Sequence, residues 1–125
     1  MRYLGIDWGE KRIGLALGDG ETKIAVPFRV AGGLEEVLEI IKEEEINAII
    51  IGKPLSITNH QLPVTKQFEK FKDELMARSG IPIELVDERL SSKAADALAG
   101  TKKTKAPRDA VAAMIILQQF LDGLK

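Results

Sequence analysis

The spacing of apolar residues changes once along the chain, from short runs typical of strands to the longer period typical of helices. Three short segments rich in large or β-branched apolar residues come first, over Arg2 to Asp7, Lys11 to Leu17 and Lys23 to Val30. We expect each of them to form a strand. Turns that contain glycine separate these segments, so the three strands are expected to form an antiparallel meander.

Helical spacing begins after the meander and then alternates with short apolar runs. The elements expected in this part are an amphipathic helix over Leu34 to Ile41, a strand over Ala48 to Gly52, a helix over Val64 to Leu75, a strand over Ile83 to Val86, a short helix from Ser91 or Ser92 to Leu98, and a last, mostly buried helix over Arg108 to Leu121. Strands joined through helices need right-handed crossovers between parallel neighbours. The pattern therefore predicts one α/β domain over residues 1–125 with an RNase H-like three-layer fold. Its mixed five-stranded sheet has three antiparallel strands, then parallel crossovers, with helices on both faces.

Composition narrows the chemistry that such a domain can perform. The 125 residues are 45% hydrophobic and 30% charged, which is typical of a globular protein, and no apolar run is long enough to span a membrane. The absence of cysteine and the single histidine exclude a thiolate metal site and a cluster of imidazole ligands. A formal net charge of -1 means that any site for a polyanion must be local. The chemistry must therefore depend on carboxylates, hydroxyls, Lys and Arg.

The amino-terminal residues bear on where the protein works. The stretch from Met1 to Asp7 reaches an acidic residue too early to contain the apolar core of a signal peptide. We expect a cytoplasmic protein with no membrane partner.

Three carboxylates occupy positions where they could converge. Asp7 ends the first predicted strand, Glu88 follows the last one, and Asp109 lies in the first turn of the final helix. The carboxyl ends of adjacent parallel strands form the usual crevice for ligands in an α/β sheet. Three converging acids would repel one another unless a hard dication neutralised them, which implies Mg²⁺ or Mn²⁺ and a metal-assisted cleavage of phosphodiesters. Alternatively, Asp7 caps a hairpin, Asp109 complements a helix dipole and Glu88 pairs with Arg89.

Four segments together resemble the YqgF (RuvX) family of RNase H-like nucleases, also described as Holliday junction resolvase homologues. The segments are Gly5 to Ala16, Ile51 to Leu55, Val86 to Ser92 and Asp109 to Gln118, and they span almost the whole chain in order. The resemblance implies that Asp7, Glu88 and Asp109 are catalytic carboxylates. It also implies cleavage of nucleic acid during maturation of the 5′ end of pre-16S rRNA, as part of ribosome biogenesis.

Basic residues supply candidate phosphate contacts. The candidates for nucleic-acid binding are Lys11, Arg12, Arg89, Lys102, Lys103, Lys105 and Arg108. The last four fall in one segment without an acid until Asp109, which is either a phosphate-binding loop or an ordinary solvated loop. Arg89 either clamps a phosphate or pairs with Asp87 or Glu84. Trp8 is expected to point away from Asp7, because side chains alternate along a strand, and to pack rather than stack on a base.

Several functions remain open at this point. The partner is expected to be RNA, and branched DNA is the alternative that a junction resolvase would cleave. A non-catalytic RNA-binding or assembly factor would retain the fold without the cleavage. A nucleotide-binding module is a further alternative, because an Asp-x-Gly hairpin such as Asp7-Trp8-Gly9 also begins nucleotide-binding folds. The sequence leaves open both the monomer and a weak homodimer.

Overall fold

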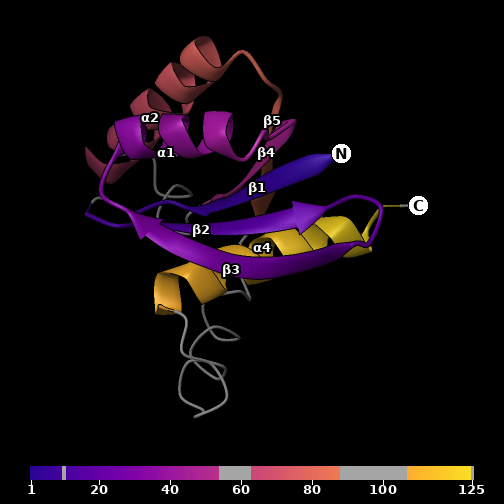
Figure 1. The fold of residues 1–125 in the computed structure, drawn as a ribbon. Helices are drawn as coiled ribbons and strands as arrows, with labels where there is room; N and C mark the ends of the chain where they lie inside the picture. The colour runs from indigo at the N-terminus through magenta and orange to yellow at the C-terminus, as the bar shows by residue number, and fades with distance from the viewer. Residues whose placement is uncertain (10, 54–62, 88–106, 125) are drawn as a thin grey trace.

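A computed structural model shows the fold and describes residues 1–9, 11–53, 63–87 and 107–124 (Figure 1). Its elements in chain order are β1 (Arg2–Asp7), β2 (Ile13–Asp19), β3 (Ile24–Ala31), α1 (Leu34–Glu43), β4 (Ala48–Lys53), α2 (Pro63–Ser79), β5 (Ile83–Asp87) and α4 (Arg108–Asp122). Each predicted strand is present within two residues of its expected ends. The second strand begins later than expected because Lys11 and Arg12 are exposed in the turn before it. The helix expected from Ser91 or Ser92 to Leu98 lies outside the described residues.

The five strands form one sheet in the order β3-β2-β1-β4-β5. The β1–β2 and β2–β3 pairs are antiparallel, whereas β1–β4 and β4–β5 are parallel. This arrangement confirms the predicted mixed sheet. Since β1, β4 and β5 run in the same direction, their carboxyl ends lie along one edge. Asp7 is the last residue of β1 at that edge, and its neighbours across the sheet are Gly14 and Gly52.

Helices cover both faces of the sheet, as Figure 1 shows, with α1 and α2 on one side and α4 on the other. Alternating residues of the central strands separate into two cores. One contains Leu4, Ile6, Leu15, Ile49 and Ile51 with Val37 and Ile40 of α1 and Phe68 and Leu75 of α2. The other contains Ala16 and Ile50 with Ala113, Ile116, Leu117 and Leu121 of α4. None of the described helices is both long enough and apolar enough to cross a membrane.

Helix α4 is mostly buried, as predicted, and it approaches the sheet closely because glycines lie beneath it. A Cβ atom on Gly5 would lie 2.7 Å from the Cβ atom of Leu117, and one on Gly18 would lie 2.8 Å from its Cδ2 atom. Both separations are too short for real side chains. The glycines of β1 and β2 therefore set how near α4 lies to the sheet, and hence the position of its first turn.

The side chain of Gln118 in α4 binds the backbone of the outermost strand, β3. Its Oε1 atom accepts a hydrogen bond from the backbone N–H of Ala25 at 2.8 Å, and its Nε2 atom donates one to the carbonyl of Lys23 at 2.8 Å. This amide mimics the hydrogen bonding of a further strand. Pro27, two residues after Ala25 in β3, has no backbone N–H that could donate a hydrogen bond. Gln118 and Pro27 together protect the β3 edge from pairing with a further strand.

Replacing Gln118 with Ala is expected to lower the free energy of unfolding by about 1 to 3 kcal/mol. The reason is that the N–H of Ala25, a residue only 6% exposed, loses its hydrogen-bond acceptor. Urea unfolding followed by circular dichroism measures the change. Gln119→Ala is the matched control, since Gln119 is exposed on the same helix. Equal stability of the two variants would contradict a role for Gln118 at the β3 edge.

Candidate active site

Asp7 lies at the end of β1 on the sheet face that α4 covers. Tyr3 belongs to the α4 core and Gly5 packs against Leu117, so strand alternation places Asp7 on the same face. Trp8 packs on the opposite face, with its ring 5.6 Å from that of Phe68 in an edge-on arrangement. The expected packing role of Trp8 is therefore confirmed.

Glycines flank Asp7 on both sides. Gly14 of β2 and Gly52 of β4 are its partners in the two adjacent ladders, so neither strand places a side chain beside its half-buried carboxylate. The sequence alone did not predict a role for Gly52. The signal that could have found it is a glycine directly after the apolar run Ala48 to Ile51, where close approach of a ligand or backbone is the usual reason.

Asp109 lies against the same part of the sheet, in the first turn of α4. A Cβ atom on Gly14 would lie only 1.9 Å from the backbone oxygen of Asp109, so the helix backbone rests directly on β2 at this point. Gly14 is thus the neighbour of Asp7 within the sheet and of Asp109 above it. The structure therefore brings the backbones of two of the three predicted site residues, Asp7 and Asp109, to the same glycine. The helix start also favours an anion at Asp109, as the alternative interpretation required.

The third carboxylate, Glu88, lies outside the described residues, and so do Arg89, Lys102, Lys103 and Lys105. Strand β5 ends at Asp87, with Val86 opposite Gly52 and Gly52 opposite Asp7. The strand that precedes Glu88 in the chain therefore ends at the edge that carries Asp7. The roles of these residues stay predictions.

Gly9 and Gly14 allow other backbone segments to approach closely at this end of the sheet. The backbone of Gly9 is not in the left-handed region. Its lack of a side chain serves close approach instead, because a Cβ atom there would lie 2.7 Å from the carbonyl oxygen of Arg12. At Gly14 the approaching group is the backbone of α4.

The cations Arg12 and Arg108 lie at this edge with Asp109. The Nη1 atom of Arg12 is 3.8 Å from the Oδ2 atom of Asp109, and the two side chains are 77% and 29% exposed. Arg108 directly precedes Asp109 at the start of α4 and is exposed, as is Lys11 beside Arg12. The sequence predicts Arg12 as a phosphate contact but has no signal for its ion pair with a carboxylate nearly a hundred residues away.

The donors at this edge suit a hard divalent cation. Carboxylate oxygens are the ligands that Mg²⁺ and Mn²⁺ prefer, and Asp7 and Asp109 supply them from a strand and a helix that meet at Gly14. Within residues 1–9, 11–53, 63–87 and 107–124, no three acidic or histidine side chains form a metal-binding group. The described residues therefore include two of the three predicted ligands, and the metal site stays a prediction.

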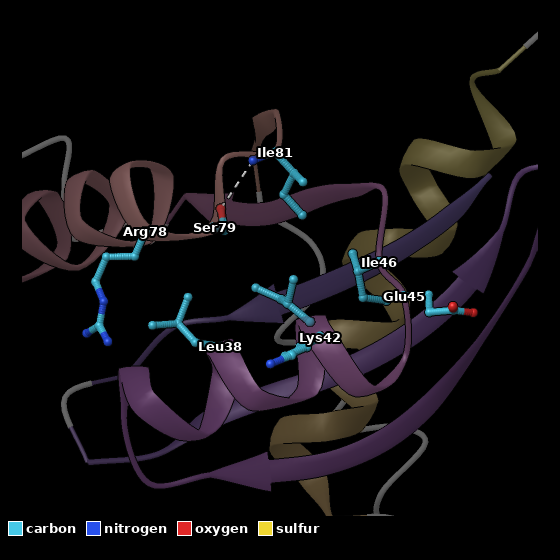
Figure 2. A pocket seen from close by; sticks show the side chains of 8 residues that line it. Leu38, Lys42, Glu45, Ile46, Arg78, Ser79 and Ile81 are labelled. Carbon is cyan, nitrogen blue, oxygen red and sulfur yellow. Dashed lines mark hydrogen bonds between the residues drawn. The ribbon is translucent and has the colours of Figure 1, made fainter.

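A cavity between α1 and the end of α2 lies at the opposite edge of the sheet, where β4 and β5 begin (Figure 2). Its volume is about 510 Å³, and apolar side chains such as Leu38, Ile46 and Ile81 line it. At its rim, Arg78 forms two hydrogen bonds with Glu35, of 2.5 and 3.1 Å, and this ion pair lowers the pKa of the Glu35 carboxyl. None of the predicted site residues is among the described residues that line this cavity.

Two solved structures share the architecture. The TM-score is 0.67 with Thermus thermophilus RuvC in complex with a Holliday junction substrate, at 15% identity and with 97% of this chain and 94% of that chain covered. It is 0.66 with fowlpox virus resolvase in complex with Holliday junction DNA, at 12% identity and with both chains fully covered. At these identities the likeness concerns the fold. It confirms the predicted RNase H-like fold, the class to which this α/β protein belongs.

Sequence comparison identifies the family within that class. Residues 1–123 match the family described as "RuvX: Holliday junction resolvase". A protein of Maridesulfovibrio salexigens is 40% identical over 132 residues, which cover 97% of this chain and 98% of its own. A protein of Chloroflexus aurantiacus is 34% identical over 131 residues, which cover 96% of this chain and 86% of its own. Both carry the name "Putative pre-16S rRNA nuclease". The chain belongs to the RuvX family, which confirms the resemblance found in its sequence.

Proposed function

We propose that this protein is a metal-dependent nuclease that hydrolyses phosphodiester bonds in the 5′-end processing of pre-16S rRNA in the cytoplasm. The observation that carries the proposal is the meeting of Asp7 and Asp109 at Gly14, on the edge where β1, β4 and β5 end. Membership of the RuvX family supports the enzyme class, a hydrolase acting on ester bonds. The names of the relatives support pre-rRNA as the substrate.

The roles of the residues follow from their chemistry. Asp7 and Asp109, with Glu88 from the sequence prediction, would hold Mg²⁺ or Mn²⁺ through carboxylate oxygens. Such a cation, when bound, activates a water molecule and stabilises the leaving oxygen of the phosphodiester. Trp8, packed on Phe68, fixes the end of β1 and thereby the position of Asp7.

Cations around the carboxylates would orient the nucleic acid. Lys11, Arg12 and Arg108 are exposed in the structure near the start of α4 or in the turn before β2. The proposal adds Arg89, Lys102, Lys103 and Lys105 from the sequence prediction. Phosphate contacts of this kind set the register of a nucleic acid without reading its sequence.

A junction-resolving DNase is the second candidate, and the description of the matched family favours it. The two candidates require the same carboxylates and differ in the shape of the nucleic acid that reaches them. Substrate choice therefore separates them.

The test is cleavage of a 16S rRNA precursor with extra 5′ sequence and of a four-way DNA junction, each with Mg²⁺, with Mn²⁺ or with EDTA. We expect shortening of the RNA with either cation and none with EDTA. Preferential cleavage of the junction would support the resolvase instead. RNA binding without cleavage under any condition would contradict the nuclease and identify a binding or assembly factor. Protection from thermal unfolding by a nucleotide, without cleavage, would identify the nucleotide-binding module.

A further inference from the structure

The ion pair between Arg12 and Asp109 joins a candidate phosphate contact to a candidate metal ligand. The closest approach, from Nη1 to Oδ2, is 3.8 Å, which is too long for a hydrogen bond. The guanidinium group is 77% exposed, so water screens the attraction. The pair is therefore an ordinary exposed ion pair, which a stronger ligand of Asp109 can displace.

The backbone of Arg12 is held in place although its side chain extends into solvent. Its carbonyl oxygen packs against Gly9 at a position that any Cβ atom would block, and Ile13, the first residue of β2, is buried. The fixed backbone and the long exposed side chain allow the guanidinium group to reach different partners from one anchor. A guanidinium group binds a carboxylate or a phosphate through the same planar set of donors.

We propose that Arg12 is an exchangeable counterion: it neutralises Asp109 in the metal-free protein, and a divalent cation displaces it so that it can bind a phosphate of the nucleic acid. This inference rests on the proposed nuclease function. A dication coordinated directly by the carboxylate outcompetes a screened guanidinium group 3.8 Å away. Metal binding and nucleic-acid binding are then coupled, because the cation that binds Asp109 also frees the Arg12 side chain to contact a phosphate.

A purely structural ion pair leads to different expectations. If Arg12 only stabilised the start of α4, its removal would lower the stability of the fold and leave the affinity for a dication unchanged. If Arg12 only contacted phosphate, its removal would weaken nucleic-acid binding equally with and without metal. The exchangeable counterion predicts effects of opposite sign, with tighter metal binding and a loss of the metal-induced gain in nucleic-acid affinity.

The experiment compares Arg12→Gln with Lys11→Gln, which removes the same charge from the adjacent exposed residue. Calorimetry measures Mn²⁺ binding to the protein alone. Fluorescence anisotropy measures binding of a short RNA with phosphorothioate linkages, which slow hydrolysis, in Mn²⁺ and in EDTA. We expect Arg12→Gln to bind Mn²⁺ about fivefold more tightly than Lys11→Gln, the lower end of ordinary coupling between sites. We also expect Mn²⁺ to strengthen RNA binding about fivefold less in Arg12→Gln than in the wild type, while Lys11→Gln keeps the wild-type gain.

The outcomes separate this inference from the function on which it rests. Absence of Mn²⁺ binding by the wild type would overturn the metal site and, with it, both proposals. Equal Mn²⁺ affinity of Arg12→Gln and Lys11→Gln would overturn the counterion role alone. An unchanged gain in RNA affinity on adding Mn²⁺ to Arg12→Gln would also overturn it. Circular dichroism of each variant checks the fold, which we expect to persist because Arg12 is 77% exposed.

Discussion

Replacing Gly14 with Ala is expected to destabilise the protein by about 3 kcal/mol or more, at or beyond the upper end of ordinary overpacking. The added Cβ atom would lie 1.9 Å from the backbone oxygen of Asp109, and no rotation of a side chain can relieve a contact with backbone. The first turn of α4 must then move away from β2. Urea unfolding followed by circular dichroism measures the loss, because α4 carries much of one core.

Gly32→Ala is the matched control for this prediction. Gly32 has no heavy atom within 4 Å of where a Cβ atom would lie, and its φ is not in the left-handed region. The expected change in stability is therefore small, or a slight gain from the lower entropy of the unfolded chain. Equal stability of Gly14→Ala and Gly32→Ala would show that α4 shifts without cost and that Gly14 does not set the geometry of the site.

The fold was predictable because its signals are local. The apolar run Ala48 to Ile51 identifies a buried strand without reference to the rest of the chain, and the glycines around the first strands indicate hairpins. The strand order then follows from few choices, because hairpins pair neighbours and crossovers are right-handed. The ends of β2 were less predictable, since Lys11 and Arg12 precede a strand without breaking its pattern.

The candidate site was predictable in its residue types but not in its contacts. Asp7 at a strand end and Asp109 at a helix start are local features, and both are at the predicted places. The approach of Asp109 to Gly14 and its ion pair with Arg12 depend on how α4 docks across the sheet. Docking of this kind is determined by the packing of the whole core. The hydrogen bonds of Gln118 with the β3 edge were missed for the same reason.

Asp7→Asn is expected to reduce cleavage more than about a hundredfold, the upper end of the loss caused by removing a group that only supports a metal ligand. The substitution removes the charge that a dication requires and keeps the size of the side chain. Gly14 and Gly52 flank this position, so an amide meets no neighbouring side chain from those strands. The fold should persist. Cleavage of the rRNA precursor under single-turnover conditions measures the effect.

Asp19→Asn is the matched control, because Asp19 lies at the opposite end of the β1–β2 ladder, paired with Arg2. It changes the net charge by the same amount and should leave cleavage unchanged. Thermal unfolding adds a readout that does not depend on catalysis. Mn²⁺ at about 100 times its dissociation constant should stabilise the wild type and Asp19→Asn by about 2.7 kcal/mol.

Asp7→Asn should lose most of this stabilisation, because a cation stabilises a fold only in proportion to its affinity for the folded state. Loss of cleavage with full stabilisation by Mn²⁺ would show that Asp7 acts on the substrate and that other residues hold the cation. Retention of both would exclude Asp7 from the site and leave Asp87 and Glu88, at and directly after the end of β5, as the candidate acids beside Asp109.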